Sequence, residues 1–252
     1  MAKHEFPAFS KEYGDRFREM GLWIDETLHG HFDEKVEEHA DVVILITPER
    51  KFTMHEFQQE TLSLAAGLLN AGVSQGDIVG VQLPNWIEFC CLQIALSRIG
   101  AVIQPLHMVF GERELKNLCA FNETDAVIVC GEYRDKDYAA QMRGAVSENE
   151  GVKTFIVVRS EPEAGEYLLQ DLIEEGRSNH DRLDGIQINP DDVFYLNFTS
   201  GTTGNPKGFL HSHNTLISRM ILTAKMQSAM SDGEHRVSLA CSPMTHSYGH
   251  FS

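Results

Sequence analysis

The stretch at residues 199–208, which reads Thr-Ser-Gly-Thr-Thr-Gly-Asn-Pro-Lys-Gly, constrains this chain more than any other part of its sequence. It lies between two apolar runs, and the run before it, at 193–196, is β-branched and aromatic, which predicts a buried strand. Glycines allow the backbone to turn several N–H groups toward one point. Hydroxyl groups add further donors and a lysine adds a positive charge, so the stretch predicts a loop that binds a polyphosphate. The groups concerned are Thr199, Ser200, Gly201, Thr202, Thr203, Gly204 and Lys207.

Two other kinds of segment are similar to this stretch in composition. A Walker A loop needs Gly-x-x-x-x-Gly-Lys-Ser/Thr, but here Pro206 stands five residues after Gly201 and Gly208 follows Lys207. A flexible linker between two domains fits the Ser/Thr/Gly composition. A linker, however, does not need an embedded Pro-Lys-Gly or a predicted strand on each side.

The ten residues resemble, without a gap, the phosphate loop of the adenylate-forming (AMP-binding) superfamily, which includes acyl- and aryl-CoA synthetases, peptide-synthetase adenylation domains and luciferases. The resemblance implies that the loop wraps the β- and γ-phosphates of ATP while a carboxylate attacks the α-phosphate. An acyl-adenylate and pyrophosphate would form, and a thiol, often that of CoA, would then displace AMP. The implied function is a carboxylate–CoA ligase that uses ATP, Mg2+ and CoA and acts on a small-molecule carboxylic acid.

Predicted strands alternate with predicted helices along most of the chain, so we expect an α/β fold with layered, largely parallel sheets and flanking helices. Thr53 and Glu56 form a capping box in front of one helix, and Asn85 and Asn214 are expected to cap two others. The strands are expected at 41–47, 77–83, 101–103, 125–130, 153–158, 193–196, 208–212 and 236–241. The helices are expected within 10–40 and at 53–72, 85–100, 112–121, 135–146, 168–175 and 214–230.

Two further segments are similar to patterns of the same superfamily. Residues 72–79 with the following Pro84-Asn85 resemble its Gly-x-x-x-Gly-Asp-x-Val pattern and Pro-Asn turn, and residues 100–106 resemble its Gly-Ala-x-x-x-Pro-Leu strand. The resemblance therefore covers the chain from about residue 30. We expect a helical N-terminal segment at 1–29 and the N-terminal portion of the ligase domain at 30–252.

The segment at 242–249, Ser-Pro-Met-Thr-His-Ser-Tyr-Gly, resembles the acyl-pocket motif of the superfamily. The resemblance implies that His246 lies at the carboxylate end of the acyl pocket, beside Ser247; a solvated loop histidine is the alternative. Aryl-acid members often have Asn where Ser247 stands, so we expect an aliphatic, alicyclic or simple aromatic acid rather than a dihydroxybenzoate. Four methionines suggest an adaptable apolar site, with ordinary helix core as the alternative: Met220, Met226, Met230 and Met244.

The histidines do not predict a metal site. His29 and His31 are expected in a turn around Gly30, and His211 and His213 alternate along a strand end without a cysteine or carboxylate nearby. His246 lacks the glutamate of the His-Glu-x-x-His protease pattern.

Charge and cysteine content limit the partners and the compartment. The net charge of −16 argues against binding to nucleic acid or to an anionic membrane surface. The five cysteines are odd in number and have no Cys-x-x-Cys spacing, which indicates reduced thiols and a cytoplasmic protein. No signal peptide is recognised, and no run approaches the roughly 18 apolar residues of a membrane span.

Several motifs of the superfamily are not found in residues 1–252: the Tyr-Gly-x-Thr-Glu segment, the ribose-binding aspartate and the catalytic lysine. We therefore expect the catalytic lysine beyond Ser252, and an N-terminal part of a longer ligase that is inactive alone. The alternative is a non-catalytic nucleotide- or acyl-binding module of the same fold.

Overall fold

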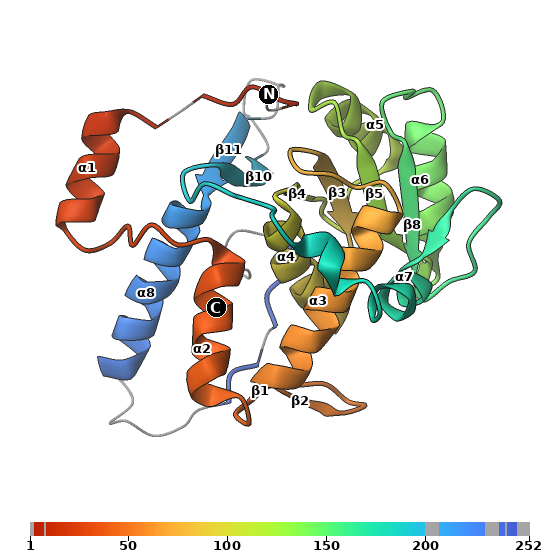
Figure 1. Cartoon of the computed structure of the whole chain (residues 1–252). Coiled ribbons are helices and arrows are strands. Elements are labelled where there is room, and N and C mark those ends of the chain that lie inside the picture. Colours follow the sequence, from red (N-terminus) through yellow and green to blue (C-terminus); the bar gives the residue numbers. More distant parts are fainter. Residues whose placement is uncertain (1–2, 8, 200–206, 230–236, 240, 246–252) are drawn as a thin grey trace.

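The computed structural model describes residues 3–7, 9–199, 207–229, 237–239 and 241–245 (Figure 1). Within this part of the chain the centre is a seven-stranded sheet with the strand order β11-β10-β4-β3-β5-β8-β9. β10 and β11 are antiparallel, and the other neighbouring strands of this sheet are parallel. The strands are β3 (Ile78–Gln82), β4 (Val102–Pro105), β5 (Ala126–Cys130), β8 (Thr154–Val158), β9 (Tyr167–Leu168), β10 (Val193–Thr199) and β11 (Lys207–Ser212). The predicted α/β, largely parallel fold is confirmed.

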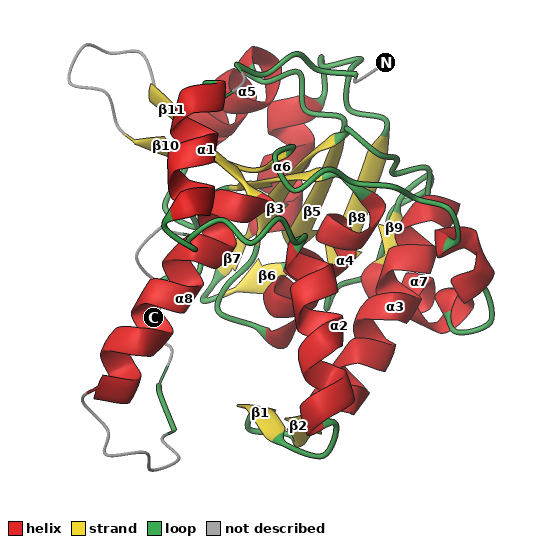
Figure 2. Ribbon diagram, turned by 60° about the vertical axis from the view of Figure 1, so that its left-hand side comes forward, coloured by secondary structure: helices red, strands yellow, loops and turns green. Residues whose placement is uncertain are grey.

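Two groups of helices flank this sheet (Figure 2). One group packs together and consists of α2 (Leu28–His39), α3 (Met54–Asn70), α4 (Ile87–Ile99) and α7 (Leu169–Gly176). The other is the pair α5 (Glu112–Phe121) and α6 (Tyr138–Val146). In Figure 1, α1 (Lys11–Glu19) and α8 (His213–Ala229) lie to the left of the sheet. A 3₁₀ helix occupies His180–Leu183.

Local sequence explains most of these elements. The central strands β3 and β5 are buried along their whole length, and they read as continuous apolar runs because helices cover both faces of a parallel sheet. The capping box in front of α3 is formed as predicted: Thr53 Oγ1 accepts from the Glu56 amide at 3.1 Å, and Glu56 Oε2 accepts from the Thr53 amide at 2.8 Å. Gly100, with φ of 72°, ends α4 in the left-handed conformation.

The packing of α3 against α7 depends on two glycines. A Cβ on Gly67 would lie 2.1 Å from the carbonyl oxygen of Leu172, and one on Gly176 would lie 1.9 Å from that of Ser63. These neighbours are backbone atoms, which cannot rotate away. The two helices therefore approach each other at a distance that no larger residue allows at either position.

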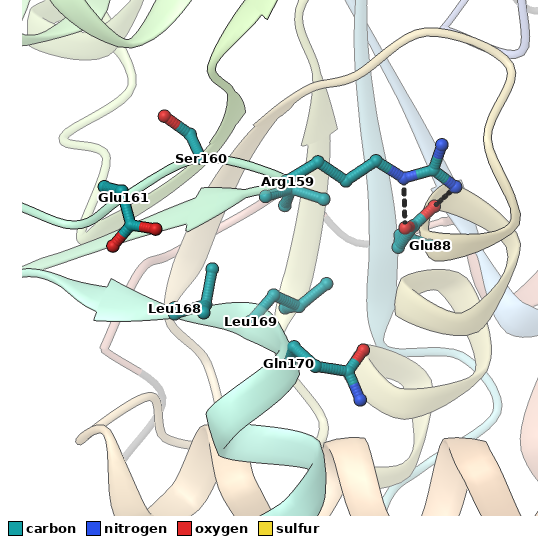
Figure 3. Close-up of a pocket in the computed structure, with 8 residues that line it drawn as sticks. Glu88, Arg159, Ser160, Glu161, Leu168, Leu169 and Gln170 are labelled. Atoms are coloured by element: carbon teal, nitrogen blue, oxygen red, sulfur yellow. Dashed lines mark hydrogen bonds and ion pairs between the residues drawn. The ribbon is translucent and has the colours of Figure 1, made fainter.

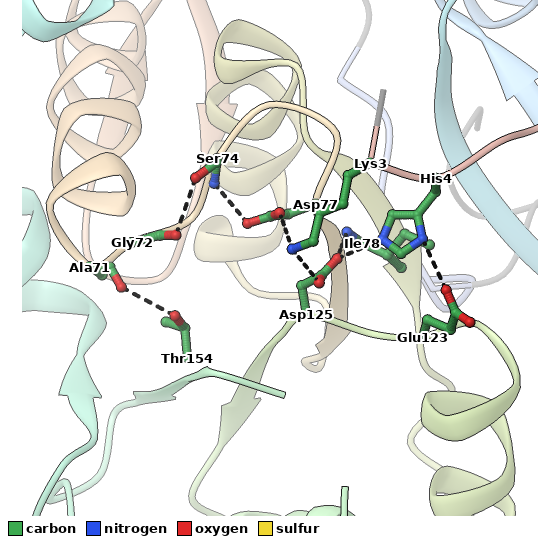
Figure 4. Close-up of polar contacts among 10 residues, drawn as sticks. All are labelled: Lys3, His4, Ala71, Gly72, Ser74, Asp77, Ile78, Glu123, Asp125 and Thr154. Carbon is green, nitrogen blue, oxygen red and sulfur yellow. Dashed lines mark hydrogen bonds and ion pairs between the residues drawn. The ribbon is translucent and has the colours of Figure 1, made fainter. Parts of the chain in front are cut away.

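The N-terminal residues are held at the amino ends of β3 and β5 (Figure 4). Lys3 Nζ lies 2.7 Å from Asp77 Oδ1 and 2.5 Å from Asp125 Oδ1, and His4 Nε2 lies 2.9 Å from Asp125 Oδ2. Burial raises the pKa of the Asp125 carboxyl, but hydrogen bonds from Lys3, the Ile78 amide and His4 outweigh it, so that pKa lies below its usual value.

The strand predicted at 41–47 forms, as β1 (Val43–Ile46), but it pairs with β2 (Lys51–Thr53) in a separate sheet rather than joining the central one. The helix predicted from residue 135 starts only at Tyr138, because a short hairpin of β6 (Glu132–Tyr133) and β7 (Lys136–Asp137) precedes it.

Four predictions are wrong. Asn85 does not cap α4: the N-cap is Trp86, without a side-chain hydrogen bond. Asn214 does not cap α8 either; Ser212 Oγ accepts from the Thr215 amide at 3.3 Å. Residues 237–239 are not a strand. The turn expected around Gly30 is instead the first turn of α2, which contains both His29 and His31.

Candidate functional site

The predicted phosphate loop connects β10 to β11. Thr199 pairs with Lys207 and Phe198 with Gly208, so the backbone at both ends of the loop is fixed on neighbouring antiparallel strands. The residues between them lie outside the described residues, namely Ser200, Gly201, Thr202, Thr203 and Gly204 together with Asn205 and Pro206. The structure thus confirms a strand on each side of the loop, and the contacts of its side chains remain predictions.

Within the strands of the β10–β11 hairpin, several side chains are apolar or neutral. Phe194, Tyr195 and Leu196 are buried, as the β-branched and aromatic sequence predicts. The ring centroid of Tyr195 lies 6.3 Å from that of His211. Burial raises the pKa of Tyr195, and burial followed by the charge of Arg219 lowers the pKa of His211, so both side chains are neutral near pH 7.

A second segment, 242–245, lies against the carboxyl ends of β3 and β4. Asn85, just after β3, donates from Nδ2 to the carbonyl oxygen of Ser242 at 2.7 Å and accepts at Oδ1 from the Met244 amide at 2.8 Å. His107, just after β4, lies 3.2 Å through Nδ1 from Thr245 Oγ1. Ligands of open parallel sheets bind outside the carboxyl ends of the strands, which is where this segment lies.

The predicted acyl-pocket residues follow this segment directly, but His246 and Ser247 lie outside the described residues. Figure 1 shows the described part of 237–245 apart from the β10–β11 hairpin. The described residues therefore do not bring the predicted phosphate loop and the predicted acyl pocket into one site. Of the four methionines, Met220 and Met226 are exposed, Met244 packs against the core with Cys90, and Met230 is not described.

Sequence reasoning missed Asn85 and His107 as contacts of the acyl-pocket segment. The signal was present, because each residue comes just after a strand predicted to be parallel, and the carboxyl ends of parallel strands meet at one edge. The sequence instead predicts a helix cap at Asn85, because Asn before a helix is a common cap. The position of a distant segment such as 242–244 could not be predicted from local pattern.

A cavity of about 510 Å3 lies at the carboxyl end of β8, between the first residues of α4 and α7 (Figure 3). Arg159 lines it and donates two hydrogen bonds to Glu88, at 2.7 and 3.1 Å. The guanidinium also lies 4.2 Å from the ring centroid of Trp86. None of the residues predicted for the site lines this cavity.

The histidines expected not to bind metal have other contacts. His213 stacks on Phe194 at 4.8 Å, and its Nδ1 accepts from the Leu28 amide at 3.3 Å. Among the described residues one group has ligand-like spacing, Glu26, His31 and Glu34, with His31 Nδ1 2.6 Å from Glu26 Oε2. It belongs to the start of α2 and not to the hairpin.

Among the described residues, none of the helices combines the length and the apolar character that a membrane span requires.

Comparison with known proteins decides the family. The model of the AMP-binding enzyme family matches residues 32–252. The chain belongs to the AMP-binding enzyme family. This AMP-binding chain is 27% identical over 215 residues to the mitochondrial medium-chain acyl-CoA ligase ACSF2 of Danio rerio, covering 79% of this chain and 35% of the relative. It is 28% identical over 244 residues to a salicylyl-CoA synthase / salicylate adenylyltransferase of Streptomyces sp, covering 95% of this chain and 44% of the relative.

Solved structures agree on the fold of this AMP-binding chain. The apo structure of MbtA from Mycobacterium smegmatis matches with a TM-score of 0.79 and 23% sequence identity, over 96% of this chain and 44% of that one. The chain thus spans less than half the length of these relatives. It corresponds to the N-terminal part of an adenylate-forming enzyme, as the sequence predicts.

Proposed function

We propose that this chain carries the ATP-phosphate loop and part of the acid-binding site of an acyl- or aryl-CoA ligase, with the ligase portion at 30–252. One observation carries the proposal: the donor-rich loop at 199–208 connects two paired strands in a chain of the AMP-binding family. The hydroxyl-bearing residues Thr199, Ser200, Thr202 and Thr203 would donate to the β- and γ-phosphates. The amides of Gly201 and Gly204 would assist, and Lys207 would supply the positive charge.

The donor set fits a polyphosphate. Residues 199–208 contain hydroxyls, glycines and one lysine but no carboxylate that would repel phosphate. ATP would supply the α-phosphate that the substrate carboxylate attacks. Because the loop has no carboxylate ligand, Mg2+ would be held mainly by the phosphates of ATP, where it shields their charge. Local donors are essential here, since the net charge of −16 opposes an anionic ligand.

The acid would bind near His246 and Ser247. These two residues directly follow, in the sequence, the segment that contacts Asn85 and His107. The relatives include a medium-chain acyl-CoA ligase and a salicylyl-CoA synthase, so an aliphatic or a simple aromatic acid is compatible with the family. We favour an aliphatic, alicyclic or simple aromatic acid, because Ser247 stands where aryl-acid members often have Asn. CoA as the thiol acceptor and a cytoplasmic location belong to the same proposal.

The alternative is a non-catalytic nucleotide- or acyl-binding module, since the chain spans less than half of its relatives. Both proposals predict that residues 1–252 release no AMP, so ATP–pyrophosphate exchange by the complete natural protein is what separates them. Under the ligase proposal this chain binds ATP weakly and releases no AMP with CoA and a mixture of acids, because groups that hold the α-phosphate and ribose are missing. Turnover on the order of 1 per second would show that 252 residues suffice.

The decisive assay for the ligase is ATP–pyrophosphate exchange by the complete natural protein across a panel of carboxylic acids. The double variant Thr202→Ala/Lys207→Ala should slow exchange strongly, whereas Lys225→Ala on the exposed face of α8 should not. Exchange unchanged in the double variant would contradict the loop assignment. A strong preference for 2-hydroxylated benzoates would contradict the proposed substrate class.

A further inference from the structure

Asn214 lies two residues beyond the end of β11, and its side chain is fully buried. Its Nδ2 donates to Asp25 Oδ1 at 3.0 Å and to Asp191 Oδ1 at 2.8 Å, and its Oδ1 accepts from the Asp25 amide at 3.0 Å. Its own amide donates to the carbonyl oxygen of Pro190 at 3.0 Å. Both donors of this buried amide and its oxygen are hydrogen-bonded, which holds the partners firmly. Asn214 thus joins three separate segments.

Arg18 of α1 closes this network from the outside. Its Nε lies 2.9 Å from both carboxylate oxygens of Asp25, and its Nη2 donates to Asp191 Oδ2 at 2.7 Å. The guanidinium also lies 5.2 Å from the ring centroid of Trp23, which is buried. Stacking on an aromatic ring orients the planar guanidinium before it binds a carboxylate.

Arg18 and Asp25 bind residues on both sides of the hairpin. Asp191 lies two residues before β10, and Asn214 lies two residues after β11. The hydrogen bonds from Arg18 lower the pKa of the Asp25 carboxyl, and the bond from Asn214 lowers it further. Asp25 is therefore ionised at neutral pH, as this arrangement requires.

The hairpin has few other attachments to the sheet. Among the described residues β11 pairs with β10 alone, and β10 pairs with β4 at one residue pair, Tyr195 with Ile103. By contrast, β3 and β5 pair over four consecutive residues. The direction in which the hairpin projects therefore depends on its buried aromatic residues and on the network at its base.

We infer that Arg18, Asp25, Asp191 and Asn214 form a brace that positions the β10–β11 hairpin, and with it the predicted phosphate loop. The identity of the ligand as ATP rests on the proposed function; the brace itself rests on the contacts above. These four are positioning residues, because none of them belongs to the loop. Through Arg18 and Asp25, the segment before α2 takes part in setting the geometry of the nucleotide site.

The test compares Arg18→Met with Arg16→Met in the 252-residue chain. Both residues lie on α1, but Arg16 has no ion pair in the described part of the chain. Hydrogen exchange followed by mass spectrometry reads the amides of β10 and β11 and, as an internal reference, those of β3 and β5. ATP binding is measured by titration, and Arg18→Lys is the conservative variant.

Arg18→Met should speed exchange in β10 and β11 by roughly threefold to fivefold, the range expected for a partly exposed ion pair, and leave β3 and β5 unchanged. ATP should bind weaker by a similar factor, Arg18→Lys should be intermediate, and Arg16→Met should match the wild type. Exchange in Arg18→Met that equals the wild type, or that rises equally in all strands, would overturn the brace. Absence of ATP binding by the wild type would count against the proposed function, and the exchange data would still decide the brace.

Discussion

Asn85 holds Ser242 against the carboxyl end of β3, with a hydrogen bond of 2.7 Å from Asn85 Nδ2 to the Ser242 carbonyl oxygen. The same side chain accepts from the Met244 amide at 2.8 Å. A residue assigned from sequence to a helix cap thus joins two segments more than 150 residues apart.

We predict that Asn85→Ala releases this segment. Loss of a hydrogen bond worth about 1 kcal/mol should speed exchange of the Met244 amide by roughly fivefold. Asn85→Asp is the comparison variant: it keeps an oxygen that accepts from the Met244 amide but sets a carboxylate oxygen against the Ser242 carbonyl, so it should free Ser242 and retain part of the protection of Met244. Hydrogen exchange of the 241–245 peptide is the measurement, and equal protection in Asn85→Ala and the wild type would contradict the contact.

Gly176→Ala should destabilise the fold by about 2 to 3 kcal/mol, because its Cβ would lie 1.9 Å from the Ser63 carbonyl oxygen and α7 would have to move away from α3. Gly144→Ala on α6 is the control. There the Cβ meets only the flexible carboxylate of Glu112, and alanine favours the helix. Urea unfolding measures the free energy of unfolding of both variants. A Gly176→Ala protein as stable as Gly144→Ala would show that α3 and α7 do not pack this closely.

Stability should fall as the pH drops below about 6.5. Burial lowers the pKa of His213 to about 3 and that of His29 to about 4. The unfolded chain therefore binds protons below its histidine pKa of about 6.5 that the folded chain does not bind, and above that pH these residues contribute no pH dependence. Between pH 6.5 and 5 each histidine should remove up to about 2 kcal/mol of unfolding free energy.

Denaturant unfolding at a series of pH values checks this sign and slope. His213→Phe keeps a ring against Phe194 and should reduce the slope, leaving the part that His29 and His211 contribute. The carboxyls with lowered pKa, such as Asp33 and Asp125, titrate below this window. An identical slope in His213→Phe and the wild type would refute the buried, neutral state of His213.

Lys3→Met should leave Asp77 and Asp125 without their shared cation. Because Lys3 is partly exposed, we expect a loss of about 1 to 2 kcal/mol, together with a rise in the pKa of Asp125. Lys35→Met, which removes only an exposed pair with Glu38, is the control. Carbon-13 NMR of the Asp125 carboxyl during a pH titration is the direct measurement, and an unshifted titration in Lys3→Met would contradict the contact between Lys3 and Asp125.

Local sequence predicted the elements whose signals are local. The capping box at Thr53 and the left-handed Gly100 mark helix ends wherever they occur, and α5 begins and ends where its pattern predicts. Asn214 was assigned wrongly because its partners, Asp25 and Asp191, lie far away in sequence or on the opposite side of the hairpin. The apolar run at 236–241 predicts a strand, yet Val237 and Leu239 are 84% and 86% exposed and pair with no strand in the described residues.

The candidate site was predicted in part. The strands on each side of the loop follow from the apolar runs beside it, and β10 extends to Thr199 because β11 pairs with it along its length. The contacts of Asn85 and His107 with 242–245 depend on how the chain returns to the sheet, which no local pattern contains.

The most direct test of the central claim is phosphorus NMR of ATP with the 252-residue chain. If residues 199–207 bind the phosphates, the β- and γ-phosphate resonances should broaden more than the α resonance, and Lys207→Ala should remove most of this effect while Lys225→Ala leaves it intact. Equal broadening with Lys207→Ala and the wild type would contradict the assignment of this loop as the phosphate-binding element.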